Sequence, residues 1–264
     1  MFSVVIPAYN SEKTIYRALK SVVDQTRVDL VKEIIVIDDG SIDNTKCEID
    51  RFFFDFSEVK LYYFKEDNHG ASYARNVGIK NSTAEWIALL DSDDVWHSDK
   101  LEVQYMILKA MPEICFLGAS PKKVGSLVDK NIKVCKLNAY QLCIRSTPTT
   151  PTVIFKKDIG MELGLFNETM EYCEDINFFQ KFLLLDNYYI YIGNLVTIGP
   201  QKKYFGESGA SSDLIRMAKG RDQNVKDLYR MKLISKKYFF LMLIINKIKL
   251  LRRLFLTQVG ISKA

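Results

Sequence analysis

The chain has 264 residues, of which 48% are hydrophobic, and its 37 basic and 32 acidic residues give a net charge of +5. This composition is typical of a globular protein with a sizeable core, and it excludes intrinsic disorder, a collagen-like repeat and a disulfide-stapled mini-protein. Five widely spaced cysteines without a Cys-x-x-Cys pair, together with only two histidines, give no zinc-binding pattern.

The positive charge is concentrated in the C-terminal tail. Residues 214–264 include 13 basic and 2 acidic residues, which leaves 24 basic and 30 acidic residues for 1–213, a balance of −6. A nucleic-acid-binding protein more often has a basic stripe over its folded core, so we expect contact with an anionic membrane surface and no nucleic-acid partner. No apolar run approaches the roughly 18 residues that span a bilayer, and Met1–Pro7 lacks a signal peptide's basic leader, so we expect a cytoplasmic protein.

The first hundred residues alternate between strand-like and helix-like patterns, which predicts an α/β fold with a parallel sheet covered by helices. The apolar run Phe2–Ile6 predicts a strand, and the 3.6-residue spacing of apolar side chains from Ile15 to Val23 predicts a helix. Further elements are expected in this order: a strand at Ile34–Ile37, a helix to about Phe56, a strand at Val59–Phe64, a helix at Ala71–Lys80 and a strand at Trp86–Leu90.

Beyond Asp99 the alternation is less regular. The expected elements are a helix at Leu101–Met111, a strand at Ile114–Gly118, loop and short strand over Ser120–Lys136, a strand at Thr152–Phe155 and a helix at Glu174–Leu185. The last fifty residues are basic and increasingly apolar, and their pattern is helical.

Three carboxylates occur within Asp91-Ser92-Asp93-Asp94, directly after a predicted strand. Such a cluster repels itself unless it is fully solvated or neutralised by a cation. An isolated Asp-x-Asp is most often a solvated turn, but the apolar strand Trp86–Leu90 would hold these acids at the mouth of a core. Hard oxygen ligands without a nearby His or Cys suit Mg²⁺ or Mn²⁺ bound between one or two carboxylates and a substrate phosphate.

A second acidic segment, Asp38-Asp39-Gly40-Ser41, follows another predicted strand and should face the same crevice, because ligands of open α/β sheets bind at the carboxyl ends of strands. A structural turn explains Ser41 well and Asp39 poorly. Asp39 can instead accept a hydrogen bond from the imide N–H of a uracil. Pro7, Ala8 and Tyr9 could wall such a base, although packing alone explains Tyr9 equally well.

Taken together, four ordered segments resemble the successive motifs of family 2 glycosyltransferases of the GT-A fold: Val4–Asn10, Val36–Ser41, Gly70–Ile79 and Leu90–Trp96. The likeness continues in Gly164–Glu168 and Glu174–Asp175 and thins out over Tyr204–Ser211. It implies a Rossmann-like, mostly parallel central sheet flanked by helices. The expected domains are a catalytic domain of residues 1–212, with a nucleotide-binding half (1–99) and an acceptor half (100–212), and a helical, basic and apolar extension of residues 213–264.

The resemblance also implies roles for individual residues. Asp39 would read the base, Asp91 would lie by the ribose with Ser92 in the same donor-binding segment, and Asp93 would hold Mn²⁺ or Mg²⁺, with Asp94 nearby. Arg75 would point toward the nucleotide or its phosphates, and Gly70 would permit close approach of the backbone that opens its helix. Asp175 would be the catalytic base, although Glu174–Asp175 also fits the acidic first turn of a helix.

The activity that the resemblance implies is metal-dependent, inverting hexosyl transfer. A nucleoside diphosphate sugar, expected to be a UDP-sugar, would donate to a hydroxyl of a glycan acceptor, expected to be lipid-linked, in surface polysaccharide synthesis at the inner face of the plasma membrane. One alternative is a sugar-phosphate nucleotidyltransferase, which would normally need a glycine-rich phosphate loop that Pro7–Glu12 lacks. Another is a non-catalytic membrane protein that binds nucleotide sugars, against which Asp93 and Asp175 argue.

Two segments depart from the family pattern or lie outside it. Relatives often carry an aromatic-Arg-x-His run where this chain has Lys202–Gly209. Its lysines could also face phosphates, but each is a point charge, whereas the guanidinium of arginine is a planar, two-pronged donor. Beyond Tyr238 the tail mixes basic and apolar residues without clean helical faces. It fits peripheral binding to an anionic membrane, and almost equally a helix pair that packs on the catalytic domain or on a second subunit of a homo-oligomer.

Overall fold

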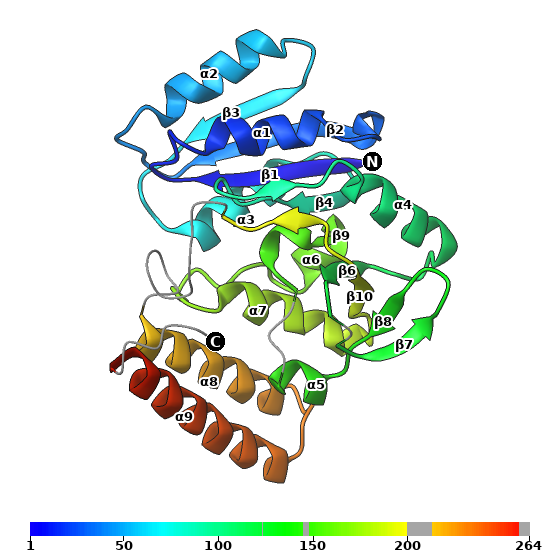
Figure 1. Ribbon diagram of the computed structural model, residues 1–264, viewed down its shortest axis with the longest axis vertical. Coiled ribbons are helices and arrows are strands. Elements are labelled where there is room, and N and C mark those ends of the chain that lie inside the picture. The colour runs from blue at the N-terminus through cyan, green and yellow to red at the C-terminus, as the bar shows by residue number, and fades with distance from the viewer. Residues whose placement is uncertain (123, 145–147, 200–212, 259–264) are drawn as a thin grey trace.

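The computed structural model describes residues 1–122, 124–144, 148–199 and 213–258, which form layers of helices around one large sheet (Figure 1). The sheet has nine strands in the order β3-β2-β1-β4-β9-β6-β10-β8-β7. Only β9 and β8 are antiparallel to the strands on both sides, so the other seven run in one direction and the expected mostly parallel sheet is confirmed. The strand bounds are β1 Phe2–Ala8, β2 Val31–Asp38, β3 Leu61–Lys65, β4 Trp86–Leu89, β6 Phe116–Ser120, β7 Ser126–Asp129, β8 Val134–Lys136, β9 Ile154–Lys156 and β10 Tyr189–Ile192.

The first four strands form a parallel block whose carboxyl ends lie together. The cores of β1, β2 and β4 are continuous apolar runs such as Ile34–Ile37, as expected for strands buried on both faces, whereas β3 at the edge of the sheet is only partly buried. In the register of the block, Ala8 pairs with Asp38, and Val5 pairs with Leu89. The segments that follow β1, β2 and β4 therefore emerge at one edge of the sheet.

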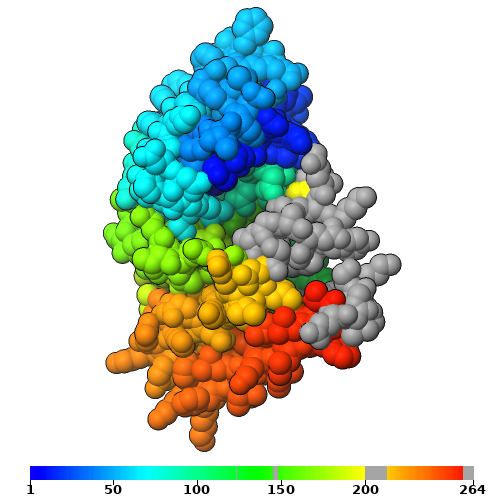
Figure 2. Space-filling view, turned by 90° about the vertical axis from the view of Figure 1, so that its left-hand side faces the viewer, coloured from blue at the N-terminus to red at the C-terminus, as the bar shows by residue number. Residues whose placement is uncertain are grey.

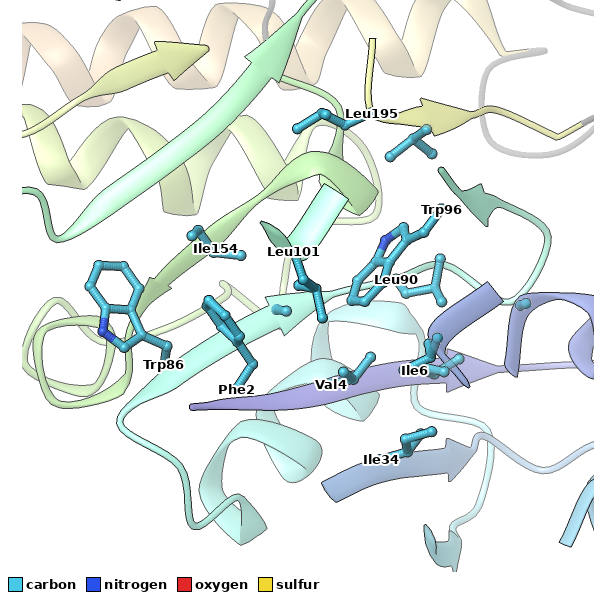
Figure 3. Packing of buried hydrophobic residues seen from close by; sticks show 14 of the residues in the cluster. Phe2, Val4, Ile6, Ile34, Trp86, Leu90, Trp96, Leu101, Ile154 and Leu195 are labelled. Carbon is cyan, nitrogen blue, oxygen red and sulfur yellow. The ribbon is translucent and has the colours of Figure 1, made fainter. Parts of the chain in front are cut away.

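Helices cover both faces of this block. Val4 and Ile6 of β1 point into a cluster with residues of α1, α2 and α4, and Figure 3 shows Phe2, Val4 and Ile6 packed with Trp96 and Leu101. Val5, between them in sequence, points to the opposite face, where it packs with Ile79 of α3. The helix bounds are α1 Ile15–Val23, α2 Thr45–Asp55, α3 Ala71–Asn81 and α4 Lys100–Ala110.

A glycine sets the distance between α3 and the sheet. A Cβ atom added at Gly78 would lie 2.5 Å from Cγ1 of Val5 and 3.3 Å from Cγ1 of Ile37, closer than real packing allows. The absence of a side chain at Gly78 lets α3 rest directly on β1 and β2. The preceding turn of α3, with Arg75 and Asn76, is thereby held at the edge where the strands end.

The second half of the chain packs around a group of aromatic side chains. Phe116 and Phe155 from the sheet contact Phe178, Phe179 and Phe182, which follow one another in α7 and in the 3-10 helix after it. The remaining elements are β5 Val95–Trp96, which pairs with β11 Val196–Thr197, the helices α5 Ala139–Ile144, α6 Lys157–Glu162 and α7 Glu174–Phe179, and the 3-10 helices η1 Val28–Leu30, η2 Thr150–Thr152 and η3 Gln180–Leu185.

Two helices end the described chain and form a hairpin at the lower end of the molecule (Figures 1 and 2). They are α8, Leu214–Arg230, and α9, Lys236–Gln258. Val225 and Leu228 of α8 and Met242 of α9 belong to the same buried cluster as the aromatic residues of α7. Within the described residues, no helix is both long enough and apolar enough to cross a bilayer.

The structure corrects several expected elements. The single helix expected over Glu174–Leu185 is α7 followed by η3, because an apolar pattern does not distinguish α-helical from 3-10 hydrogen bonding. The strand expected from Thr152 begins at Ile154, after a 3-10 turn that contains Pro151. The stretch Ser120–Lys136 contains two strands, β7 and β8. The expectations for Lys202–Gly209 and Tyr204–Ser211 lie outside the described residues.

Candidate functional site

A cavity of about 650 Å³ opens at the edge where β1, β2 and β4 end. Most of the residues expected to bind a nucleotide sugar line it, and Gly70 and Asp175 do not. The lining residues are Pro7, Ala8, Tyr9, Asn10, Ser11, Glu12, Lys13, Thr14, Asp39, Asp43, Ala71, Arg75, Asp91, Ser92 and Asp93. The structure thus brings together three sequence segments and the first turns of α3.

Asp39 joins the end of β2 to the start of α3. Its Oδ1 accepts a hydrogen bond from the backbone N–H of His69 at 2.8 Å, and its Oδ2 accepts one from that of Gly70 at 2.8 Å. Each carboxylate oxygen can accept a second hydrogen bond, so Asp39 can still accept hydrogen bonds from a molecule bound in the cavity. Asp38 has a structural role, because it accepts hydrogen bonds from the Tyr63 hydroxyl and the Ser41 backbone and does not line the cavity.

Gly70 has φ of 93° and ψ of 163°, a conformation that residues with side chains rarely adopt. This conformation points its N–H at Asp39 just before α3 begins. A Cβ atom added there would meet no other protein atom within 4 Å, so the expected close approach of its backbone to a nucleotide stays a prediction.

Tyr9 and Ser92 both line the cavity, on the loops that follow β1 and β4. The Tyr9 side chain is 50% exposed while it lines the cavity, which argues against a role in core packing alone. Ser92 shares a 2.8 Å hydrogen bond with Ser11, so the loop after β4 is tied to the loop after β1. Aromatic and polar surfaces are therefore presented together at this edge.

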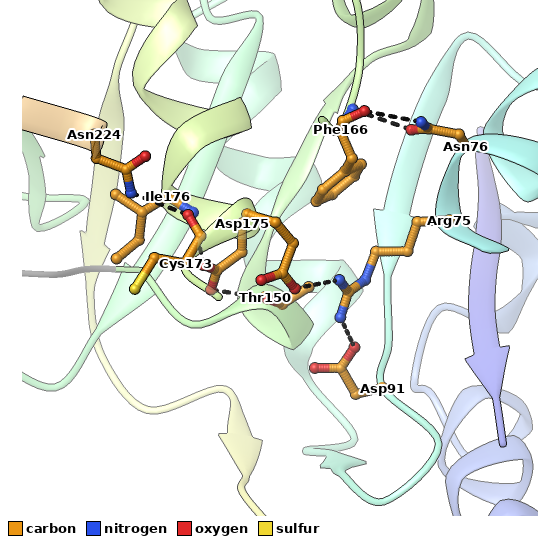
Figure 4. A network of polar contacts seen from close by, with 10 residues as sticks. Arg75, Asn76, Asp91, Thr150, Phe166, Cys173, Asp175, Ile176 and Asn224 are labelled. Atoms are coloured by element: carbon orange, nitrogen blue, oxygen red, sulfur yellow. Dashed lines mark hydrogen bonds and ion pairs between the residues drawn. The ribbon is translucent and has the colours of Figure 1, made fainter. Parts of the chain in front are cut away.

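Arg75 is buried and paired with two carboxylates from distant parts of the chain (Figure 4). One terminal nitrogen lies 2.8 Å from Asp91, after β4, and the other lies 3.0 Å from Glu174, at the start of α7. The two negative charges raise the pKa of the guanidinium above its usual range despite burial. Its Nε–H finds no acceptor among the described residues.

A second contact attaches the same turn of α3 to the segment before α7. The side chain of Asn76 donates to the carbonyl of Phe166 at 2.9 Å and accepts from its N–H at 3.0 Å (Figure 4). It also donates to Glu168 at 2.7 Å. The segments Gly70–Ile79 and Gly164–Glu168 are thus held together by paired backbone and side-chain hydrogen bonds.

Asp175 lies beside the cavity in the first turn of α7. Its carboxylate accepts hydrogen bonds from the N–H of Ile176 at 2.7 Å and from the hydroxyl of Thr150 at 3.3 Å. Burial, followed by the charge of Glu174, raises the pKa of Asp175 to about 6, and the charge of Arg75 opposes this rise. A carboxylate with a pKa close to neutrality is suited to accept and release a proton.

The cavity carries more negative than positive charge. Its lining includes five carboxylates and two cations, and one of those cations, Arg75, is already paired with two acids. Asp91 and Asp93 present hard oxygen donors of the kind that Mg²⁺ and Mn²⁺ bind. No group of three or more His, Cys, Asp or Glu side chains converges on one point within the described residues. The donor set therefore fits a cation whose remaining ligands come from substrate phosphates.

Sequence patterns do not reveal the pairing of Glu174 with Arg75, because it joins residues 99 positions apart. Asp94 was expected near the metal, but it is 4% exposed, accepts a hydrogen bond from the N–H of Gly199 and does not line the cavity. No local signal in the sequence distinguishes Asp94 from Asp93.

Residues 3–147, more than half of the chain, match the family model described as Glycosyl transferase family 2. The UDP-Glc:alpha-D-GlcNAc-diphosphoundecaprenol beta-1,3-glucosyltransferase WfgD of Escherichia coli is 41% identical over 110 residues, 41% of this chain and 42% of that protein. The putative teichuronic acid biosynthesis glycosyltransferase TuaG of Bacillus subtilis (strain 168) is 31% identical over 149 residues, 56% of this chain and 58% of that protein. The chain spans less than two thirds of the length of the curated relatives it matches.

Two solved structures are similar in fold. A Staphylococcus aureus TarS 1-349 complex with UDP-GlcNAc has a TM-score of 0.65 and 19% identity, over 92% of this chain and 70% of that chain. The mannosyltransferase PcManGT from Pyrobaculum calidifontis, in complex with GDP-Man and Mn²⁺, has a TM-score of 0.68 and 19% identity, over 94% of this chain and 69% of that chain. At these identities the similarity shows the fold alone.

The Arg75 pairing generates a stability prediction. Arg75→Gln leaves the partly buried carboxylates of Asp91 and Glu174 without their shared cation, so the free energy of unfolding should fall by about 3 kcal/mol, the lower end of the range for breaking a buried pair. Urea unfolding of the ligand-free protein measures this fall in the free energy of unfolding. The matched control is Arg27→Gln, in an exposed pair with Asp29, which should cost less than about 1 kcal/mol. Equal small losses for the two variants would show that the Arg75 pairing does not hold the site together.

Proposed function

The chain belongs to glycosyl transferase family 2 and has the GT-A fold, and on that basis we propose that it is a metal-dependent, inverting glycosyltransferase. It moves a sugar from a nucleoside diphosphate sugar to a hydroxyl of a glycan acceptor. The observation that carries this proposal is the acidic cavity at the strand ends, with Arg75 and Asp175 beside it. Family membership favours this reaction over the nucleotidyltransferase alternative.

The donor is proposed to enter with its base between Tyr9 and Asp39. Tyr9 is exposed enough to provide an aromatic face, and the Asp39 carboxylate is fixed by two backbone N–H groups. Such a carboxylate accepts the imide N–H of uracil, so a UDP-sugar is the proposed donor. WfgD, named for transfer from UDP-Glc, and the TarS complex with UDP-GlcNAc support this choice.

Asp93 is proposed to hold the divalent cation, with Asp91 and Ser92 beside the nucleotide. A bound Mn²⁺ or Mg²⁺ would neutralise the diphosphate and stabilise the negative charge of the leaving group. The excess of carboxylates over cations in the cavity supports this requirement, because a diphosphate entering without a cation would be repelled. The Mn²⁺ in the PcManGT complex is consistent with it.

Asp175 is proposed to remove the proton of the attacking hydroxyl. The acceptor oxygen forms a bond to the anomeric carbon while the bond from that carbon to the diphosphate oxygen breaks, and the proton passes to the Asp175 carboxylate. Attack on the face opposite the leaving group inverts the anomeric centre, so an α-linked donor gives a β-linked product. Thr150 and the start of α7 fix the carboxylate for this role.

The acceptor is proposed to be a lipid-linked glycan at the cytoplasmic face of the plasma membrane. The similarity to WfgD, named for an alpha-D-GlcNAc-diphosphoundecaprenol acceptor, and to TuaG, a putative teichuronic acid biosynthesis glycosyltransferase, supports a role in surface polysaccharide synthesis. As part of this proposal, residues 1–212 form a catalytic domain and residues 213–264 form an extension. The nucleotide half would supply the donor site and the acceptor half the base.

The first test of the function replaces the proposed metal ligand. Asp93→Ala should lower Mn²⁺-dependent transfer from a UDP-sugar by roughly 10²-fold or more, because the lost charge stabilisation amounts to several kcal/mol. Glu12→Gln is the matched control, since it removes another carboxylate of the same cavity and should leave most of the transfer. Transfer at the wild-type rate in Asp93→Ala, with an unchanged Mn²⁺ dependence, would contradict the metal assignment.

The second test concerns the base. Asp175→Asn should keep the dissociation constant for UDP with Mn²⁺ and lose about 10²–10⁴-fold in transfer, because an amide cannot accept the proton. The wild-type rate should fall as the pH drops through about 6, where Asp175 becomes protonated. Asp24→Asn, at an exposed pair with Lys20, is the control and should change neither quantity. Parallel loss of UDP binding and transfer in Asp175→Asn would assign the residue a structural role.

The same carboxylate makes stability depend on pH in a definite direction. Its pKa is raised to about 6 in the folded protein, against about 4 in the unfolded chain. Burying the ionised group therefore destabilises the fold fully above pH 6, and the penalty is progressively lost as the pH falls from 6 to 4. Asp175→Asn should accordingly be more stable than the wild type at pH 7, and this gap should close toward pH 4.

A further inference from the structure

We infer that the outward face of α9 binds the surface of an anionic lipid bilayer. This face carries an apolar stripe of six large side chains, each between 49% and 63% exposed: Phe240, Leu241, Ile244, Ile248, Leu251 and Phe255. A row of exposed large hydrophobic residues along one helix marks an interaction surface rather than ordinary surface composition.

The structure separates the stripe from the part of α9 that holds the fold together. Leu241, Ile244, Ile248, Leu251 and Phe255 follow one another at steps of three and four residues, so they lie in one line along the helix. Met242 and Asn246 belong to another side, where they are almost fully buried and Asn246 donates to Asp222 of α8 at 2.9 Å. The helical wheel of the whole tail mixes these two sets, which is why the sequence shows no clean face.

The charges beside the stripe favour anionic lipid over a second copy of the chain as its binding partner. The exposed cations Lys237, Lys247 and Arg252 border it, and α9 contains no acidic residue. A second copy packed stripe to stripe would bring these cations together without a carboxylate on either helix to pair with them. Anionic lipid phosphates complement the same cations, and long basic side chains can extend to the headgroups while their helix lies in the interface.

The shape of the molecule leaves this face accessible. The hairpin of α8 and α9 forms the lower end of the protein in both views, with α9 outermost in Figure 1 and its orange-to-red atoms on the surface in Figure 2. Since none of the helices within the described ranges is suited to cross a bilayer, α9 would lie on the membrane. The stripe would enter the interface while the inner side of α9 remains packed on α8.

The test is co-sedimentation of the full chain with vesicles of phosphatidylcholine alone or mixed with phosphatidylglycerol. The stripe variant carries Ile244→Gln, Ile248→Gln and Leu251→Gln, and the charge variant carries Lys247→Gln and Arg252→Gln. The matched control carries Ile42→Gln, Phe54→Gln and Met106→Gln, three apolar residues elsewhere on the surface that are at least as exposed as the three replaced in the stripe. Thermal unfolding verifies that every variant is folded.

The wild type and the matched control should sediment with the anionic vesicles at low salt and less at high salt. The stripe and charge variants should each bind the same vesicles roughly tenfold more weakly or worse. The inference is overturned if the wild type stays in the supernatant, or if both variants bind like the wild type. It is also overturned if light scattering shows a wild-type dimer that the stripe variant dissociates.

Nucleotide binding separates this inference from the proposed function. The stripe variant should bind UDP with Mn²⁺ as tightly as the wild type, because α9 does not line the donor cavity. Vesicle binding without any nucleotide binding would uphold the lipid surface and contradict the glycosyltransferase. Nucleotide binding and transfer without vesicle binding would support the glycosyltransferase and contradict the lipid surface.

Discussion

The arrangement of the site depends on one buried cation held between two carboxylates. Arg75 reaches Asp91 after β4 and Glu174 at the start of α7, and it occupies that place because Gly78 lets α3 lie against the sheet. Through this bridge the loop that carries Asp93 and the helix that carries Asp175 take fixed positions relative to each other. Burial and the charge of Glu174 raise the pKa of Asp175, and the charge of Arg75 opposes this rise, so the bridge affects the proton affinity of the proposed base as well as its position.

The charge of the cavity determines what it can bind. Five carboxylates and two cations line it, and a diphosphate would meet net repulsion there unless a divalent cation entered with it. In the proposed function Asp93 would hold that cation, and the phosphates of the donor would supply the remaining oxygen ligands.

The sequence predicted the parallel strands and the acidic segments that follow them, because continuous β-branched runs such as Ile34–Ile37 have few alternative structures. It also identified the family, which the match over residues 3–147 confirms. Local patterns could not reveal the Arg75–Glu174 pair, since its partners meet only after folding. They also did not reveal the backbone angle of Gly70, and they merged α7 with η3. The buried and exposed sides of α9 can be told apart only in the folded structure, where α8 covers one of them.

The central claim is that this acidic cavity binds a nucleoside diphosphate together with a divalent cation. Calorimetric titration of UDP into the wild-type protein, with Mn²⁺ and then with a chelator in its place, measures this most directly. The account predicts binding with Mn²⁺ that is at least about tenfold weaker in the chelator, because the carboxylates then repel the diphosphate. Equal affinity under both conditions would contradict it.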